Sequence, residues 1–204
     1  MGAIVIYDYA GFSNPGGTIY TESNVVVPAN AMLLTMHAGN GTRANAATLD
    51  GQLMDTWHED RNGEIGGAEV RWCAYYGYPQ GTYDIVFDIV NIAKATMGGY
   101  LILTGTRNTY YEEDTDEGGL ASGTVMTPHN GIAVAMWSGP QNSNNNFENA
   151  IMNNDWAAFP QYQNFGYNRG TAENETMGET SNWGGTIAVY SFEPSLIPGL
   201  PIMF

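Results

Sequence analysis

The chain has 204 residues, of which 43% are hydrophobic and 12% aromatic. This composition excludes a disordered chain, and the length predicts one folded domain with a sizeable core. Six lysines and arginines stand against 21 aspartates and glutamates, which gives a formal net charge of -15. Because such a surface repels phosphate groups, we expect partners that are neither nucleic acids nor anionic membranes.

The cysteine content and the search for targeting segments indicate where the protein is made. Cys73 is the only cysteine, so no internal disulfide can form, and synthesis in a reducing compartment is indicated. Residues 1–11 carry no basic region of the kind that begins a signal peptide. No apolar run reaches the roughly 18 residues of a membrane-spanning helix. We therefore expect synthesis in the cytoplasm.

Short strands separated by turns are predicted for the first sixty residues. We expect strands at residues 3–9, 18–27 and 31–37, a loop of turn residues at 11–17, and a turn at 28–31. Between residues 45 and 58, Asp50-Gly51 separates two short extended runs, which is a strong hairpin signal.

The central stretch, residues 68–90, reads as two strands joined by a tight turn. Val70 and Trp72 alternate with polar neighbours in the first, and Ile85 and Phe87 do so in the second. Period-two alternation places one set of side chains on a buried face. Residues 77–81 contain a proline and two glycines, as a turn requires. We predict a core hairpin with no catalytic group in it.

The second half is less regular. We expect strands at 98–104, 119–127, 132–137 and 184–192, an exposed acidic loop at 106–118, and a long irregular loop insertion at 139–183. In the 132–137 strand, Ile132, Val134 and Met136 lie opposite Ala133, Ala135 and Trp137. No exact internal repeat is visible.

About nine to eleven short strands at this spacing predict an all-β fold, a two-sheet antiparallel β-sandwich of jelly-roll-like type with long irregular loops. Residues 1–193 would form this single domain, and residues 194–204 an apolar C-terminal docking tail.

The order of these segments resembles a family of β-sandwich proteins that tailed bacteriophages and prophages encode as virion structural or decoration modules. The segments are NVVVPANAMLLTMHAG, ATLDGQLM, VRWCAYYGYPQGTYDIVFDI, GGYLILTGT, HNGIAVAMWSG and WGGTIAVYSF, across residues 20–193. The most specific piece is residues 78–83, YPQGTY, followed by an alternating strand. The resemblance implies a β-sandwich fold and a virion role, and it brings no catalytic residues. The insertion at 139–183 departs from the family pattern.

The sequence offers few candidates for a catalytic or metal-binding site. The acidic run contains Glu112, Asp114 and Asp116, alternate carboxylates that are weak candidates for a calcium site. A solvated acidic loop is the plainer interpretation. The three histidines have no zinc-binding spacing, no Gly-x-Ser-x-Gly elbow is present, and paired acids alone do not make a glycosidase. We expect no enzyme activity and no required cofactor.

Aromatic residues gather in or near residues 137–183 and offer a second kind of site. Trp137, Trp156, Tyr162 and Tyr167 are candidate glycan contacts, because exposed rings can stack on sugars while asparagines bind hydroxyls. Anchors of a long loop, or a subunit interface, would give the same composition.

The tail supplies the candidate interface residues, which are Leu196, Ile197, Leu200, Ile202, Met203 and Phe204. Apolar groups left in water are unfavourable, so the tail should dock either back on its own sandwich or on another chain, and we favour another chain. We expect a structural component of a tailed-phage virion, first of all a capsid decoration protein that forms homo-oligomers, with a trimer as the specific expectation. Its partners would be other virion proteins such as the major capsid protein, and its location the virion. A tail-associated or receptor-recognising carbohydrate-binding module is the alternative.

Overall fold

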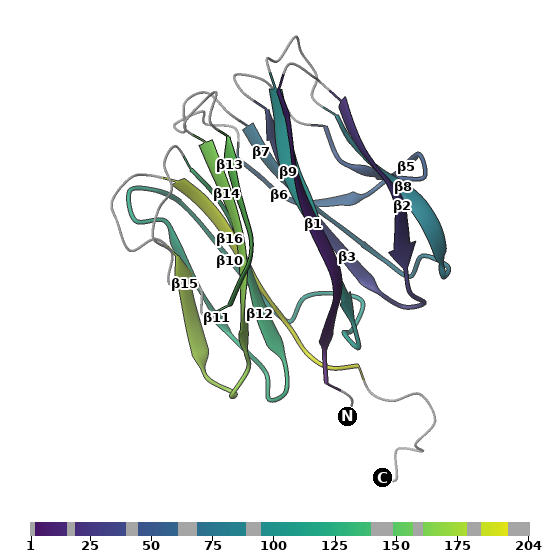
Figure 1. Ribbon diagram of the computed structural model, residues 1–204. Helices are drawn as coiled ribbons and strands as arrows, with labels where there is room; N and C mark the ends of the chain where they lie inside the picture. Colours follow the sequence, from purple (N-terminus) through teal and green to yellow (C-terminus); the bar gives the residue numbers. More distant parts are fainter. Residues whose placement is uncertain are drawn as a thin grey trace.

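The computed structural model describes residues 3–15, 19–39, 45–60, 69–88, 95–139, 149–156, 161–178 and 185–195. These residues form antiparallel sheets packed face to face (Figure 1). The predicted all-β sandwich is therefore confirmed, although it has four sheets rather than two. Its jelly-roll type stays a prediction.

The first half of the chain builds two sheets. Its strands are β1 (Val5–Pro15), β2 (Ile19–Val27), β3 (Met32–Gly39), β4 (Thr48–Leu49), β5 (Gln52–Leu53), β6 (Asp55–Asp60), β7 (Glu69–Tyr76), β8 (Gly81–Asp88) and β9 (Ala95–Thr104). One sheet has the order β1-β9-β3-β7-β6, and the other has the order β2-β8-β4-β5. We call β1 to β9 the first unit.

The second half builds the other two. Its strands are β10 (Glu112–Gly118), β11 (Ser122–Met126), β12 (Ile132–Gly139), β13 (Asn149–Trp156), β14 (Gln161–Arg169), β15 (Asn174–Gly178) and β16 (Gly185–Phe192). A five-stranded sheet has the order β10-β16-β12-β14-β13, and a two-stranded sheet pairs β11 with β15. We call β10 to β16 the second unit.

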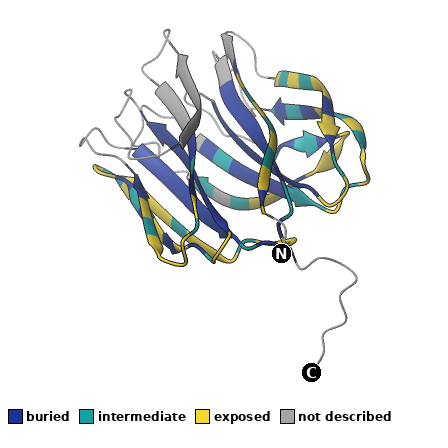
Figure 2. Ribbon diagram, turned by 60° about the horizontal axis from the view of Figure 1, so that its bottom comes forward, coloured by how far each residue is buried: buried dark blue, intermediate teal, exposed yellow. Residues whose placement is uncertain are grey.

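Three apolar clusters join the four layers. The central core lies between the two five-stranded sheets and includes Trp72, Met136 and Phe165. An outer core of each unit lies between its five-stranded sheet and its smaller sheet. Both faces of the five-stranded sheets are thus covered, and β12 and β16 are buried at every position (Figure 2).

Alternation along the strands explains this layering. In β12, the side chains of Ile132, Val134 and Met136 enter the central core, whereas those of Ala133, Ala135 and Trp137 enter the outer core of the second unit. The predicted division of this strand into two faces is confirmed. A strand that is buried on both faces needs apolar residues at all positions, as β12 has.

The two units repeat the same strand order. Replacing β1, β9, β3, β7 and β6 by β10, β16, β12, β14 and β13 converts one five-stranded sheet into the other, and β2-β8 likewise becomes β11-β15. Only the β4-β5 hairpin lacks a counterpart among the described strands.

Local details repeat as well. The turn before β3 has a hydrogen bond from Ala31 N to Pro28 O (3.2 Å), and the turn before β12 has one from Gly131 N to Pro128 O (2.7 Å). Asn30 and Asn130 occupy the left-handed region in these turns, with φ of 55° and 59°. The pairing of β6 with β7 shifts register between Thr56 and His58, and that of β13 with β14 does so between Ala150 and Met152. The first shift lies opposite Trp72 of β7 and the second opposite Phe165 of β14. Trp72 pairs with Met36 of β3 and Phe165 pairs with Met136 of β12, so the two residues hold equivalent positions in their units.

The prediction of a central hairpin is wrong. β7 and β8 follow each other in sequence, but β7 belongs to the five-stranded sheet and β8 to the smaller one, so the intervening turn crosses between layers. In β8, Ile85 and Phe87 are buried as predicted. In β7, however, Cys73 is buried on the face opposite Trp72, because this strand lies in an inner layer. The Asp50-Gly51 hairpin is confirmed, with φ of 49° and 78° at its two central residues.

Three predicted loops contain strands. β1 continues through residues 11–15, β10 occupies most of the acidic segment, and β13, β14 and β15 lie within the supposed insertion at 139–183. β1, β13 and β10 stand at sheet edges, where one side of a strand faces solvent and polar side chains are tolerated. Such strands lack the apolar alternation by which a sequence reveals them.

Candidate functional site

An open pocket of about 190 Å³ lies at the β6 edge of the first unit's five-stranded sheet, beside the segment that leads into β10. Its walls are Met32, Asp55, Trp57, Ala74, Tyr75, Tyr76, Asn108 and Thr109. The pocket therefore combines residues of β3, β6 and β7 with two residues that follow β9.

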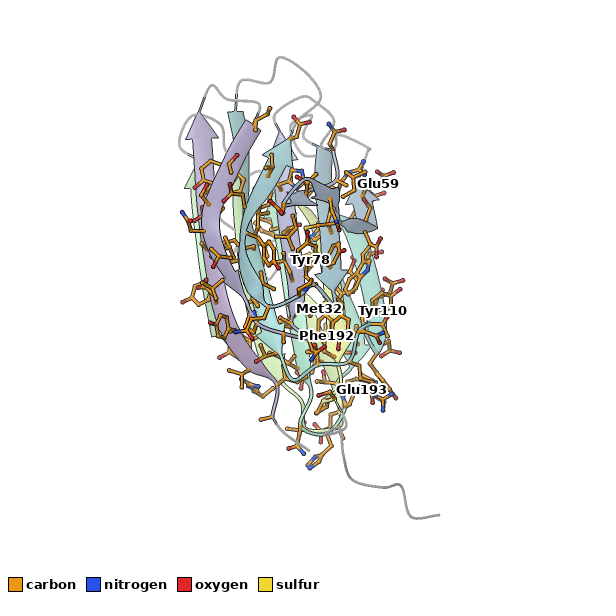
Figure 3. All side chains as sticks on the ribbon, turned by 90° about the vertical axis from the view of Figure 1, so that its right-hand side faces the viewer. Met32, Glu59, Tyr78, Tyr110, Phe192 and Glu193 are labelled. Carbon is orange, nitrogen blue, oxygen red and sulfur yellow. The ribbon has the colours of Figure 1, made fainter. Side chains whose placement is uncertain are left out.

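Aromatic packing fixes the Trp57 ring of this pocket. Its centroid lies 4.9 Å from that of Tyr110 in an edge-to-face arrangement, 5.0 Å from Tyr190 and 6.2 Å from Phe192. Trp57 stands at the register shift of β6, which places an extra residue in the strand. Tyr110 and Phe192 are labelled in Figure 3 near Met32. The Trp57 ring, half-buried, is thus held in place before any ligand arrives.

Four polar side chains line the same pocket. Asp55, Asn108 and Thr109 are exposed and Tyr76 is half-buried. None of the four makes a side-chain hydrogen bond or ion pair with another residue of the described part of the chain. Their donors and acceptors are consequently available to a ligand. Nearby, burial and then a hydrogen bond to Glu113 raise the pKa of Tyr110, so its phenol stays neutral at ordinary pH.

The acidic residues proposed for calcium have a different environment. Glu112 accepts a hydrogen bond from the main-chain N–H of Met126, Asp114 from Thr124 (2.7 Å) and Asp116 from Ser122 (3.1 Å). The three carboxylates therefore lie in a row along β10 and bind the edge of β11, which links the two sheets of the second unit. Among the described residues, no group of three or more histidine, cysteine, aspartate or glutamate side chains could hold a metal ion.

The proposed glycan residues do not form one site. Trp137 is fully buried in the outer core of the second unit, while Tyr167 packs against the central core on the other face of the same sheet. This part of the prediction is wrong, because alternation sends the two rings to opposite sides. The main chains of Trp156 and Tyr162 lie in β13 and β14, and their side chains fall outside the described residues.

The apolar tail, residues 196–204, also lies outside the described residues. Several contacts fix the three residues that precede it. Ser195 N donates to Gly105 O (2.7 Å), Pro194 forms a bridge with Thr106, and Arg107 pairs with Glu193 (2.7 Å). Gly105 lies against Ala3 and Ile4, at the beginning of β1.

Three large side chains of β1 are exposed close to this point. Val5 is 51% exposed, Tyr7 49% and Tyr9 46%. We call these three residues the edge stripe, because β1 is the edge strand of its sheet and pairs only with β9 in the described part of the chain. The sequence pattern VIYDY contains the stripe, but alternation alone cannot say which strand will stand at an edge.

Two titratable groups lie deep in the outer core of the first unit. Burial raises the pKa of the Cys73 thiol, so the thiol stays protonated and unreactive. Burial lowers the pKa of His37 from 6.5 to about 4, and the His37 ring packs edge-on against Phe87 with centroids 5.4 Å apart. Neither group reaches the Trp57 pocket, whose lining does not include them.

Comparison of the chain with protein-family models, curated proteins and solved structures finds no match. The described residues contain no helix of the length and apolarity that crossing a membrane would need.

Proposed function

We propose that this chain is a non-enzymatic structural component of a tailed-phage virion, and specifically a capsid decoration protein that assembles through its apolar tail. The observation that carries this proposal is the position of the edge stripe beside the departure point of the tail. Exposed apolar residues on an edge strand favour association, and free proteins usually avoid them.

The layered core supports the same role. Two sandwich units share one central core, so the described residues form one block whose smaller sheets lie on its two outer sides. A rigid body with an apolar attachment segment suits a protein that reinforces a particle surface. The order of sequence segments, which resembles virion modules of tailed phages, supplies the link to a virion. A tail-associated position remains the second candidate.

The docking partner that we propose is the edge stripe of a second copy. Nine residues follow Ser195, and they include Leu196, Ile197, Leu200, Ile202, Met203 and Phe204. Fully extended, they would span at most about 30 Å, which exceeds the length of the stripe. Prolines at positions 198 and 201 favour an extended backbone, which reaches a neighbour more readily than it folds back.

The test compares the solution mass of the full chain with that of a chain ending at Ser195. This truncation keeps the Pro194 bridge and every described residue. Light scattering after gel filtration should give a defined oligomer for the full chain and a monomer for the truncated chain. Tyr7→Ser should also weaken the oligomer, whereas Leu53→Ser, at a 69% exposed apolar residue of β5, should not. Monomers in all cases would refute assembly through the tail.

A further inference from the structure

We propose that the Trp57 pocket binds a neutral pyranose ring, such as the terminal sugar of a cell-surface polysaccharide. The inference goes beyond the structural role proposed above and does not rest on it, since the pocket and the edge stripe share no residue. It would give a virion component, or any other carrier of this fold, a means of recognising a glycan.

The pocket walls are chemically suited to a sugar ring. A pyranose presents apolar C–H groups on its faces and hydroxyl groups around its rim. Trp57 and Tyr76 stand in the wall, but most of the surface that the wall offers to a ligand is polar. Asp55, Asn108 and Thr109 supply hydrogen-bond acceptors and donors that are unused within the described part of the chain. The pocket thus offers mainly hydrogen-bonding groups, which suit the hydroxyl-rich rim of a sugar ring.

The size and charge of the pocket favour one neutral ring. Pockets for drug-sized ligands measure about 300–1,000 Å³, so the Trp57 pocket, at about 190 Å³, suits one ring rather than a long ligand. Asp55 lies in the wall and the chain carries a net charge of -15, which disfavours sugars with carboxylate or sulfate groups. A neutral hexopyranose, or an N-acetylated one, meets both conditions.

The second unit has different residues at the positions equivalent to the pocket. Tyr76 pairs with Met32, and in the second unit Arg169 pairs with Ile132, so Arg169 occupies the position of Tyr76. By the same registers, Tyr167 occupies the position of Ala74.

These replacements change the surface at the equivalent place. The Arg169 guanidinium donates to Ile4 O, and it lies 5.5 Å from the centre of the Tyr167 ring. Ile4 belongs to the segment that leads into β1, as Asn108 and Thr109 belong to the segment that leads into β10. In the second unit Arg169 therefore joins the two walls, whereas in the first unit Tyr76, at the equivalent position, makes no side-chain hydrogen bond within the described part of the chain. The pocket is a specific departure from a repeated framework.

The Trp57 ring is preorganised. Because Tyr110, Tyr190 and Phe192 hold the Trp57 ring, binding costs little side-chain ordering at this position. A single sugar ring makes few contacts, so we expect a dissociation constant on the order of 1–10 mM.

The experiment follows the indole N–H of Trp57 by NMR during titration of the full chain. The probes are the methyl glycosides of glucose, galactose, mannose and N-acetylglucosamine, and Trp57→Phe identifies the resonance while keeping an aromatic ring in place. At least one glycoside should shift the Trp57 signal saturably. Asn108→Ala and Thr109→Val should each weaken binding about fivefold, which corresponds to the loss of one hydrogen bond. These two residues are exposed, so neither change should prevent folding.

Matched controls lie far from the pocket. Thr82→Val and Thr21→Val each remove an exposed hydroxyl, one from β8 and one from β2, and both should leave the dissociation constant unchanged. The proposal is overturned if no glycoside shifts the Trp57 signal, or if the controls weaken binding as much as the pocket variants do. Binding of choline in place of every sugar would also overturn it, because the pocket would then recognise a cation over an aromatic ring.

Discussion

Replacing Phe165 by alanine should destabilise both units of the molecule together. Phe165 is fully buried in the central core, at the register that Trp72 occupies in the first unit. Truncation of a buried phenylalanine to alanine costs about 3–5 kcal/mol, because transfer energy and a cavity term add. For a chain of this length the melting temperature should fall by roughly 10 °C. The exposed Leu53→Ala change should leave the melting temperature nearly unaltered.

Hydrogen exchange detected by mass spectrometry can show which strands lose protection in the Phe165→Ala variant. If the central core joins the units energetically, Phe165→Ala should accelerate exchange in peptides from β3 of the first unit and from β12 of the second unit to a similar extent. Faster exchange confined to the second unit, with unchanged protection of β3, would refute the shared core. The two units would then be independent sandwiches that merely touch.

Further predictions concern single contacts. Because the pKa of His37 is lowered to about 4, the unfolded chain binds a proton that the folded chain excludes, so stability should fall as the pH drops from about 6.5 to 4. In urea titrations across that range, His37→Leu should lose part of this dependence, and an unaltered slope would contradict the argument. Asp114→Ala should cost about 1–2 kcal/mol in the same assay by freeing Thr124 N–H, whereas no loss would show that this bond is dispensable. Gly98→Ala should lower the melting temperature by several degrees, since its Cβ would lie 2.5 Å from Met36 O; an unchanged melting temperature would show that the sheet can adjust.

Much of the strand content follows from the sequence, since alternation and turn residues act locally. Asp50-Gly51 predicts its hairpin because type I′ turns need two left-handed residues. Alternation identifies β12 and its two faces for a similar reason. The partner of each strand does not follow, because it depends on distant segments. The pairing of β7 and β8 was mispredicted for this reason: both alternate, but nothing local states that the chain changes layers between them.

Neither the repeat of the two units nor the pocket can be predicted from the sequence, and the reasons differ. Residues 28–39 and 128–139 share only a proline, an asparagine, a methionine and a glycine at equivalent positions, since many apolar residues satisfy the same buried sites. The pocket joins Trp57 of β6 to Asn108 and Thr109, about 50 residues later, with no motif between them. Trp137 was a poor candidate for glycan contact, because an aromatic ring in sequence does not reveal which sheet will cover it.

Disulfide trapping tests most directly the claim that one copy docks its tail on the edge stripe of another. Tyr7→Cys and Ile202→Cys are combined in one chain, and the buried Cys73 thiol does not compete. Mild oxidation should give covalent oligomers on a non-reducing gel, in greater amounts than either single variant gives. A cross-link confined to monomers, or no cross-link, would contradict assembly through the tail.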